Sequence, residues 1–166
     1  MKNIVLIGMP GVGKSTVGVI LAKELGYRFL DTDLLIQERE GIRLKEILER
    51  DGVDGFLSIE EEICATLQAE RSVIATGGSV VYGEKAMAHF QEIGTIVYLR
   101  LPYAQLEKRL GDLRNRGVVL RDGQTLQELY SERTPLYERY ADITVEENGL
   151  DMEETLTAVR KALSGV

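Results

Sequence analysis

Eight residues near the start of the chain carry a pattern that is associated with phosphate binding. Gly8–Ser15 fits G-x-x-x-x-G-K-[ST], the phosphate-binding loop (P-loop) of nucleotide triphosphatases and kinases. In such a loop, glycines let backbone N–H groups turn toward phosphate oxygens, and the following helix adds its positive dipole. We expect Lys14 to reach the β- and γ-phosphates of ATP, and the Ser15 hydroxyl to hold Mg²⁺. The residues that we expect to contact the nucleotide here are Gly11, Val12, Gly13, Lys14, Ser15 and Thr16.

The segments on either side of the loop predict the strand–loop–helix context that the motif requires. Ile4–Ile7 is a short apolar run, typical of a buried parallel strand. After the loop, apolar residues recur at helical spacing from Val17 to Leu25, and Gly26 is placed to end that helix. The alternative, a glycine-rich turn with an exposed lysine, does not require this context.

Two aspartates follow the second predicted strand, Tyr27–Asp31. A P-loop site needs a carboxylate near Mg²⁺, usually at the end of an apolar strand, and we expect Asp31 to fill this role through water. Asp33 lies two residues further on and is a candidate base or orienting group for the hydroxyl that accepts the phosphoryl group. The alternative is that Asp33 caps a helix that begins at Leu34.

A pair of glycines, Gly77-Gly78, follows the predicted strand Val73–Thr76. They are compatible with a plain turn, or with a close approach of the backbone to a substrate. The carboxyl ends of parallel strands lie at one edge of a sheet, where ligands bind. We therefore expect the P-loop, Asp31–Asp33 and Gly77–Ser79 to converge on one rim.

Arginines in the second half of the chain are candidates for phosphate and carboxylate binding. The segment Gly111–Gly123 has little apolar periodicity and carries Arg116 with two other arginines, as in a lid that closes over transferring phosphate. A solvated charge cluster is the alternative. Arg133, beside Thr134-Pro135, could clamp a substrate carboxylate or form a surface ion pair.

Strands that alternate with helices predict a three-layer α/β fold with about five parallel strands in one domain, residues 1–166. We expect a turn at Gly55–Ser58, with Glu60, Glu61 and Glu62 near the N-terminus of the helix that follows it. Pro135 is expected to end or kink a helix over Thr125–Tyr140. Asp151 and Glu154 resemble a capping box that opens the last helix.

Composition narrows the classes of function. Lys and Arg total 20 against 27 Asp and Glu, a net charge of −7, which argues against nucleic acid or an anionic membrane as partner. The single cysteine, Cys64, excludes an internal disulfide and is expected in the core, and the single histidine, His89, cannot form a triad. Only four strongly apolar residues precede the first glycine, which we expect to be too short for a signal peptide or a membrane span. We expect a cytoplasmic monomer that acts on a small molecule.

Four ordered motifs make the sequence resemble the shikimate kinases over nearly its whole length. These are Gly-Met-Pro-Gly-Val-Gly-Lys-Ser-Thr at 8–16, Leu-Asp-Thr-Asp at 30–33, Ala-Thr-Gly-Gly at 75–78 and Glu-Arg-Thr-Pro-Leu-Tyr at 132–137. The resemblance implies a nucleoside-monophosphate-kinase-like fold, MgATP as donor, and phosphorylation of a ring hydroxyl of shikimate in aromatic amino-acid biosynthesis. It also implies roles for individual residues: Ser15 and Asp31 for Mg²⁺, Asp33 for the acceptor hydroxyl, Gly78 for the substrate, Arg109 near the adenine, Arg116 over the phosphates, and Arg133 for the shikimate carboxylate.

The sequence departs from the family pattern at three places. Gly-Phe-Arg appears as Gly55-Phe56-Leu57, so one arginine that binds the substrate carboxylate is missing. The triple glycine reads Gly77-Gly78-Ser79, and the lid Arg-Pro reads Arg116-Gly117. The alternatives to shikimate kinase are a kinase of another small hydroxylated metabolite and a regulatory module that binds nucleotide without transfer. A GTPase is disfavoured because no Asn-Lys-x-Asp motif occurs.

Overall fold

The computed structural model describes residues 2–110 and 118–165. Its centre is a parallel sheet with the strand order β2-β3-β1-β4-β5, which confirms the predicted α/β architecture. The strands are β1 (Asn3–Ile7), β2 (Arg28–Asp31), β3 (Ser72–Ala75), β4 (Gly94–Arg100) and β5 (Ile143–Glu146). Every residue of β1 and of β3 is buried, as expected for central parallel strands covered on both faces.

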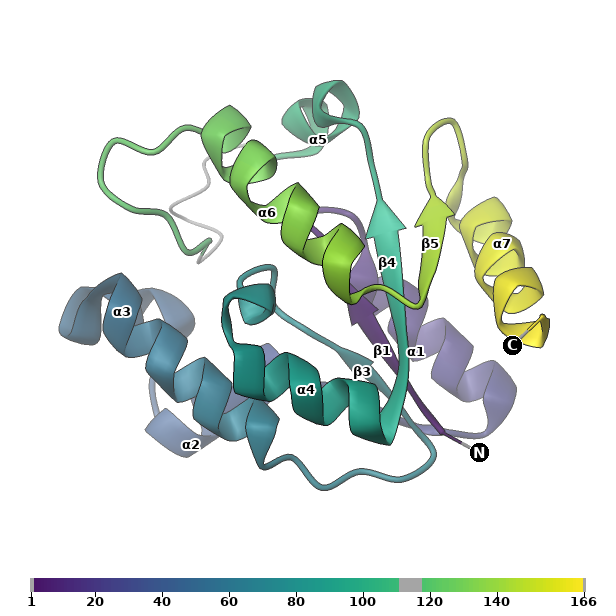
Figure 1. Cartoon of the computed structure of the whole chain (residues 1–166), viewed down its shortest axis with the longest axis horizontal. Helices are drawn as coiled ribbons and strands as arrows, with labels where there is room; N and C mark the ends of the chain where they lie inside the picture. The colour runs from purple at the N-terminus through teal and green to yellow at the C-terminus, as the bar shows by residue number, and fades with distance from the viewer. Residues whose placement is uncertain (1, 111–117, 166) are drawn as a thin grey trace.

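Helices cover both faces of the sheet (Figure 1), with α4 and α6 on one side and α1, which contacts α7, on the other. The described helices are α1 (Lys14–Leu25), α2 (Thr32–Glu40), α3 (Leu44–Ala65), α4 (Glu84–Ile93), α5 (Tyr103–Arg109), α6 (Leu126–Tyr140) and α7 (Met152–Ser164), with a short 3₁₀ helix η1 (Val80–Tyr82). No helix in residues 2–110 and 118–165 combines the length and apolar character needed to cross a membrane.

Helix α3 corrects one sequence-based expectation. The turn predicted at Gly55–Ser58 is wrong, because these residues lie inside the helix that runs from Leu44 to Ala65. The break in this helix lies at Gly52 instead, with φ 73° and ψ −178°. Packing of Phe56 into a cluster with Ile36 and Ile47 outweighs the weak helix propensity of the nearby glycine. The three glutamates at 60–62 therefore lie far from the helix N-terminus, and Glu60 is buried.

Other expectations about the helices are resolved by hydrogen bonds. Helix α6 continues past Pro135 to Tyr140, so the proline does not end it. The capping box of α7 is confirmed, since Glu154 N donates to Asp151 Oδ1 (2.8 Å) and Asp151 N donates to Glu154 Oε1 (3.2 Å). Cys64 is fully buried in the main core, as expected.

Candidate active site

The P-loop joins the end of β1 to the start of α1. Gly13 is the N-cap of α1 and takes a left-handed conformation (φ 87°, ψ 27°) that favours glycine. Lys14 is the first helical residue, and Ser15 and Thr16 follow it with exposed side chains, while Val12 is buried. The loop therefore presents the first N–H groups of a helix, which have no intrahelical partner, at the carboxyl edge of the sheet.

The ammonium group of Lys14 is buried within the loop. Its Nζ donates to the carbonyl oxygens of Gly8 (2.6 Å) and Met9 (2.9 Å). Burial lowers the pKa of Lys14 to about 8, and the negative charges of Asp33, Glu147 and Asp31 oppose this shift. The side chain is thus held by the loop itself, at the point where phosphate would supply a further negative charge.

Asp31 has two separate functions in this structure. Its Oδ1 accepts hydrogen bonds from the backbone N–H groups of Asp33 (2.9 Å) and Leu34 (3.4 Å), so Asp31 is the N-cap of α2. The alternative that Asp33 caps this helix is therefore wrong, because α2 begins at Thr32 and Asp33 lies in its first turn. The other oxygen, Oδ2, accepts a hydrogen bond from Ser15 Oγ (3.0 Å).

The contact between Ser15 and Asp31 fits the expected magnesium site. A hydroxyl and a carboxylate, from the P-loop and from the end of β2, bring two oxygen ligands together, and oxygen is what Mg²⁺ prefers. In the described part of the chain, no group of three or more His, Cys, Asp or Glu side chains forms a candidate metal cluster. Mg²⁺ usually keeps several waters and is held by one or two carboxylates together with phosphate oxygens.

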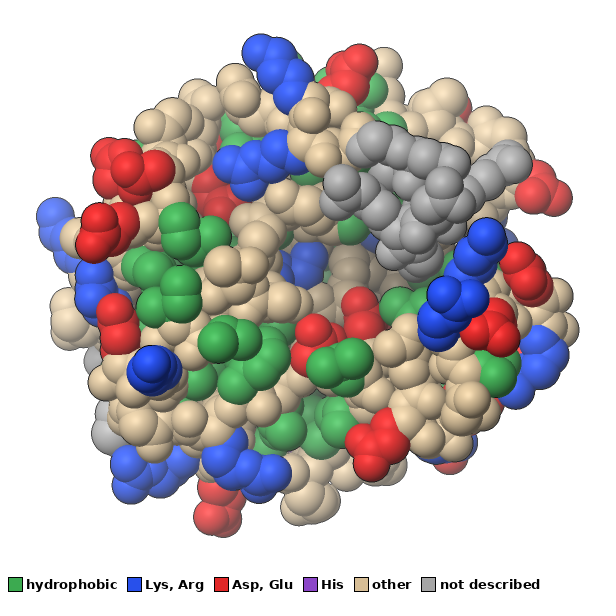
Figure 2. All heavy atoms as spheres, turned by 180° about the vertical axis from the view of Figure 1, so that it is seen from behind, with side chains coloured by type: hydrophobic (Ala, Val, Ile, Leu, Met, Phe, Trp, Pro, Cys, Tyr) green, Lys and Arg blue, Asp and Glu red, His purple; other side chains and the backbone are tan. Residues whose placement is uncertain are grey.

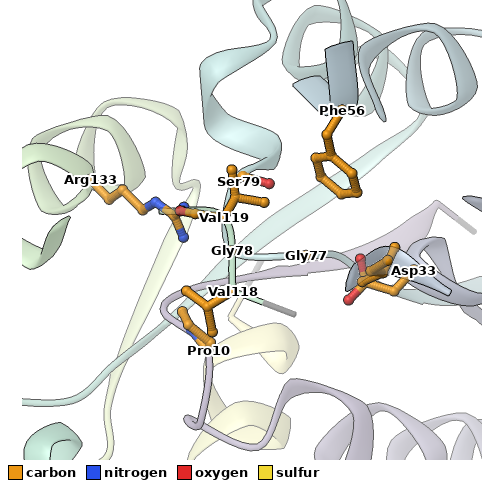
Figure 3. Close-up of a pocket in the computed structure, with 10 residues that line it drawn as sticks. Pro10, Asp33, Phe56, Gly77, Gly78, Ser79, Val118, Val119 and Arg133 are labelled. Atoms are coloured by element: carbon orange, nitrogen blue, oxygen red, sulfur yellow. The ribbon is translucent and has the colours of Figure 1, made fainter. Parts of the chain in front are cut away.

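A cavity beside the P-loop is lined by residues from six segments of the chain (Figure 3). Its lining residues are Pro10, Asp33, Leu44, Phe56, Gly77, Gly78, Ser79, Val118, Val119 and Arg133. Figure 2 views the molecule from behind relative to Figure 1 and shows a hollow with a basic side chain inside it and acidic side chains beside it. The predicted convergence of the P-loop, Asp31–Asp33 and Gly77–Ser79 on one rim is observed here, and Arg133 lies at the same cavity.

The two glycines of this cavity allow close packing against charged side chains. A Cβ on Gly77 would lie 2.7 Å from Asp33 Oδ1, and a Cβ on Gly78 would lie 2.8 Å from Arg133 Nη1. Any side chain at either position would therefore displace a charged group of the cavity. This explains the glycine pair better than a plain turn does.

Asp33 and Arg133 face the cavity from opposite sides of Gly77 and Gly78 (Figure 3). Burial, together with the neighbouring charge of Asp31, raises the pKa of Asp33 to about 6. Its carboxylate thus binds a proton more readily than an exposed aspartate does, which suits a group that receives a proton from an acceptor hydroxyl.

Arg133 points inward from α6, with 1% of its surface exposed. Its Nη2 donates to the carbonyl oxygen of Val119 (2.8 Å), and its guanidinium lies over the ring of Tyr82 at 5.4 Å. The expected alternative of a surface ion pair is wrong, since Arg133 is in none of the ion pairs between described residues and is buried. A buried cation without a carboxylate partner is available for an anionic group of a ligand.

Part of the predicted lid lies outside the described residues, including Arg116 and the range 111–117. The remainder of the segment contacts the cavity, because Val118 and Val119 are buried in its wall. Arg121 forms an exposed ion pair with Asp54 of α3 (3.0 Å). Closure of this segment stays a prediction.

Arg109 and an acidic residue that sequence reasoning missed lie near the P-loop. Arg109 ends α5, and its Nη1 donates to the carbonyl oxygen of Gly11 in the P-loop (3.3 Å). Glu147 follows β5 directly and is 3% exposed, and its Oε2 has no hydrogen-bond partner among the described residues. Burial raises the pKa of Glu147 to about 7, opposed by the charges of Arg109 and Lys14.

Glu60 is a second acidic residue that the sequence did not single out. It is buried in the middle of α3, where burial raises the pKa of its carboxyl group to about 7. Leu57, one turn earlier, is absent from the lining of the Asp33–Arg133 cavity and instead lines a second cavity together with Glu60 and Tyr82. A triple glutamate gives no local signal that one of its members is buried.

Comparison with known proteins decides the family. The family model described as shikimate kinase matches residues 10–164. The chain belongs to the shikimate kinase family. A shikimate kinase of Thermodesulfovibrio yellowstonii is 38% identical over 164 residues, covering 97% of this chain and 94% of that protein. A shikimate kinase of Francisella tularensis subsp. novicida is 35% identical, with 95% of this chain and 92% of that protein covered.

Solved structures agree with this assignment. The family member from Acinetobacter baumannii, determined in complex with shikimate, superposes with a TM-score of 0.88 at 30% identity, covering 99% of this chain and 94% of that chain. The member from Aquifex aeolicus superposes with a TM-score of 0.80, also at 30% identity, covering 98% and 96%. A gluconokinase of Sinorhizobium meliloti is 20% identical, with a TM-score of 0.51, and shares the fold alone.

Proposed function

We propose that this protein is a shikimate kinase, which transfers the γ-phosphoryl group of ATP to a ring hydroxyl of shikimate. The observation that carries the proposal is the cavity in which Asp33 and Arg133 face each other across Gly77 and Gly78, beside the P-loop. Such a cavity offers a proton acceptor at one side and a guanidinium at the other. Shikimate carries its accepting hydroxyl and its carboxylate on different carbons of one ring, so each group has a partner in the cavity.

Within this proposal, Asp33 receives the proton of the acceptor hydroxyl. The hydroxyl oxygen forms a bond to the γ-phosphorus, the bond from that phosphorus to the bridging oxygen breaks, and ADP leaves. The charge on the equatorial oxygens is stabilised by Lys14 and by the backbone N–H groups of the P-loop, because phosphoryl transfer depends mainly on positioning and electrostatics. Arg116 supplies a further positive charge when the segment 111–123 closes and excludes water.

Mg²⁺ belongs to the same proposal, with Ser15 and Asp31 as the side chains that hold it. The ion would neutralise negative charge on the phosphates of ATP. Ser15 Oγ lies within 3.0 Å of Asp31 Oδ2, which supports a shared site for these two groups. Asp31 is also held by its helix-capping hydrogen bonds, so its carboxylate is already oriented before a ligand binds.

Arg133 is the proposed partner of the shikimate carboxylate. It is buried, and its Nη2 and Nε are already held, by Val119 O and by the Tyr82 hydroxyl (3.4 Å) respectively. These contacts fix the plane of the guanidinium before the substrate arrives, which reduces the entropy lost on binding. Monomeric state, cytoplasmic location and a role in aromatic amino-acid biosynthesis complete the proposal, supported by the family membership.

The test is a panel of hydroxy acids, sugars and polyols assayed with MgATP, in which ADP formation is measured. We expect shikimate to give the highest kcat/KM. A panel member that exceeds shikimate by about a hundredfold, a difference of roughly 2.7 kcal/mol, would overturn shikimate as the substrate and leave a kinase of another metabolite. Tight ATP binding without turnover on any panel member would instead indicate a regulatory module.

A further inference from the structure

Glu60 places a carboxyl group beside Gly77 and close to Asp33, two residues that line the cavity between Asp33 and Arg133, called the acceptor cavity below. Its Oε2 lies 3.0 Å from the position that a Cβ on Gly77 would take, and Asp33 Oδ1 lies 2.7 Å from the same point. Glu60 is 2% exposed, and this Oε2 has no hydrogen-bond partner among the described residues. A buried carboxyl group of this kind is costly unless it is held by a partner.

Position 57, three residues before Glu60 on α3, is where a cationic partner of Glu60 would lie, and it holds a leucine. Residues three apart lie on the same face of a helix, so residue 57 is next to residue 60 on α3. Both side chains line the second cavity, which also contains Tyr82 and Gly83. An arginine at position 57 would lie beside the Glu60 carboxyl group, whereas Leu57 offers neither charge nor hydrogen bond.

Ser79 supplies the hydrogen bond that Leu57 does not. Its Oγ donates to Glu60 Oε1 at 2.7 Å, and the side chain is 3% exposed. Ser79 is also the N-cap of the 3₁₀ helix η1, a position where serine commonly caps the helix, but its side chain makes no capping hydrogen bond. The hydroxyl is therefore committed to Glu60 and not to the local backbone.

We propose that Ser79 is a positioning residue of the acceptor site, which holds the Glu60 carboxyl group against Gly77 and Asp33 in place of the cation that Leu57 cannot provide. This inference rests on the proposed function, because Ser79, Gly77 and Asp33 line the cavity that would bind shikimate. It also makes Ser79 and Leu57 a coupled pair: the hydroxyl at 79 matters most when position 57 is not basic.

Four proteins test this coupling: the wild type, Ser79→Ala, Leu57→Arg and the double variant. For each, KM is measured separately for shikimate and for MgATP. In the wild-type background, Ser79→Ala should raise KM for shikimate about tenfold, the usual effect of losing one hydrogen bond to a charged group, and should leave KM for MgATP within about twofold. In the Leu57→Arg background, Ser79→Ala should raise KM for shikimate less than about threefold, because the introduced guanidinium holds Glu60.

Ser58→Ala is the matched control, since Ser58 is an exposed serine on the same helix as Glu60 and should change neither KM. The proposal is overturned if Ser79→Ala has the same effect in both backgrounds, changes both KM values alike, or changes neither. If the alanine variant does not fold, Ser79→Gly, which restores the family residue, replaces it in the cycle.

A second cycle does not depend on shikimate. The free energy of unfolding is measured for the wild type, Ser79→Ala, Glu60→Gln and their combination. We expect the two single effects to be non-additive, because both changes remove the same hydrogen bond, and additive effects would overturn the contact. If the wild type fails to phosphorylate shikimate while this coupling is present, the proposed function fails and the Ser79–Glu60 contact stands.

Discussion

Replacing Arg133 by lysine keeps a positive charge in the acceptor cavity but removes the planar guanidinium. Arg133 now uses Nη2 for Val119 O (2.8 Å) and Nε for the Tyr82 hydroxyl (3.4 Å), with its plane over the Tyr82 ring. A lysine ammonium donates all its hydrogen bonds from one nitrogen, so it lacks the planar fork by which the guanidinium reaches Val119 O and the Tyr82 hydroxyl and can also face a carboxylate. Arg133→Lys therefore tests the contribution of the planar guanidinium while the positive charge is kept.

The size of the effect follows from the contacts that are lost. A hydrogen bond between a guanidinium and a carboxylate is worth about 1.5–3 kcal/mol net, and each 1.4 kcal/mol corresponds to roughly a tenfold change in affinity. We expect KM for shikimate to rise about ten- to a hundredfold, with KM for MgATP unchanged. The free energy of unfolding should fall by about 1–3 kcal/mol if the carbonyl of Val119 loses its donor.

The assay measures ADP formation at varied shikimate and saturating MgATP, then at varied MgATP and saturating shikimate. Arg139→Lys is the control, because Arg139 lies on the same helix, is exposed, and stacks over Tyr140 at 5.3 Å away from the cavity. The reasoning is refuted if KM for shikimate in Arg133→Lys stays within about twofold of the wild type, well below the effect of losing one charged hydrogen bond.

Two further predictions concern single residues. Lys14→Ala should lower kcat/KM by several orders of magnitude without unfolding the protein, and retention of more than about a tenth of the wild-type turnover would contradict the P-loop assignment. For Glu60, burial raises the pKa from 4.5 to about 7 in the folded state, so its contribution to stability is present below the lower value and is lost as the pH rises through the higher one. Glu60→Gln cannot titrate, so its free energy of unfolding relative to the wild type should increase between about pH 5 and about pH 8, as measured by urea unfolding. Glu62→Gln is the control. If the free energies of unfolding of Glu60→Gln and the wild type change in parallel with pH, Glu60 does not titrate in this way.

Local sequence signals predicted the strand, loop and helix around Lys14 correctly. The P-loop depends on glycines at fixed spacing between a strand and a helix, and these features are encoded within a few residues of Lys14. The convergence of Asp33 and Gly77–Ser79 followed from the topology of parallel strands, which places successive carboxyl ends on one edge. Family membership also follows from this ordered set of motifs.

Features that depend on tertiary packing were missed or misplaced. Glu60 and Glu147 are adjacent to other acidic residues in the sequence, and only packing of distant segments shows that each is buried. The start of α2 was predicted at Leu34, two residues late, and the alternative role of Asp33 as its cap is wrong. Asp31 and Asp33 are equally good caps in isolation, and only the backbone geometry selects Asp31. The turn at Gly55 failed because a favourable contact of Phe56 with other helices overrides local propensity.

The two carboxylate oxygens of Asp31 have different partners, so cation binding to one oxygen can be detected at the partners of the other. Oδ1 accepts hydrogen bonds from the backbone amides of Asp33 and Leu34, while Oδ2 accepts one from Ser15 Oγ. A cation that binds Oδ2 withdraws electron density from the whole carboxylate and weakens the hydrogen bonds to Oδ1. The amide resonances of Asp33 and Leu34 should therefore move in an NMR titration with Mg²⁺, so that metal occupancy can be followed in the absence of nucleotide, acceptor and turnover.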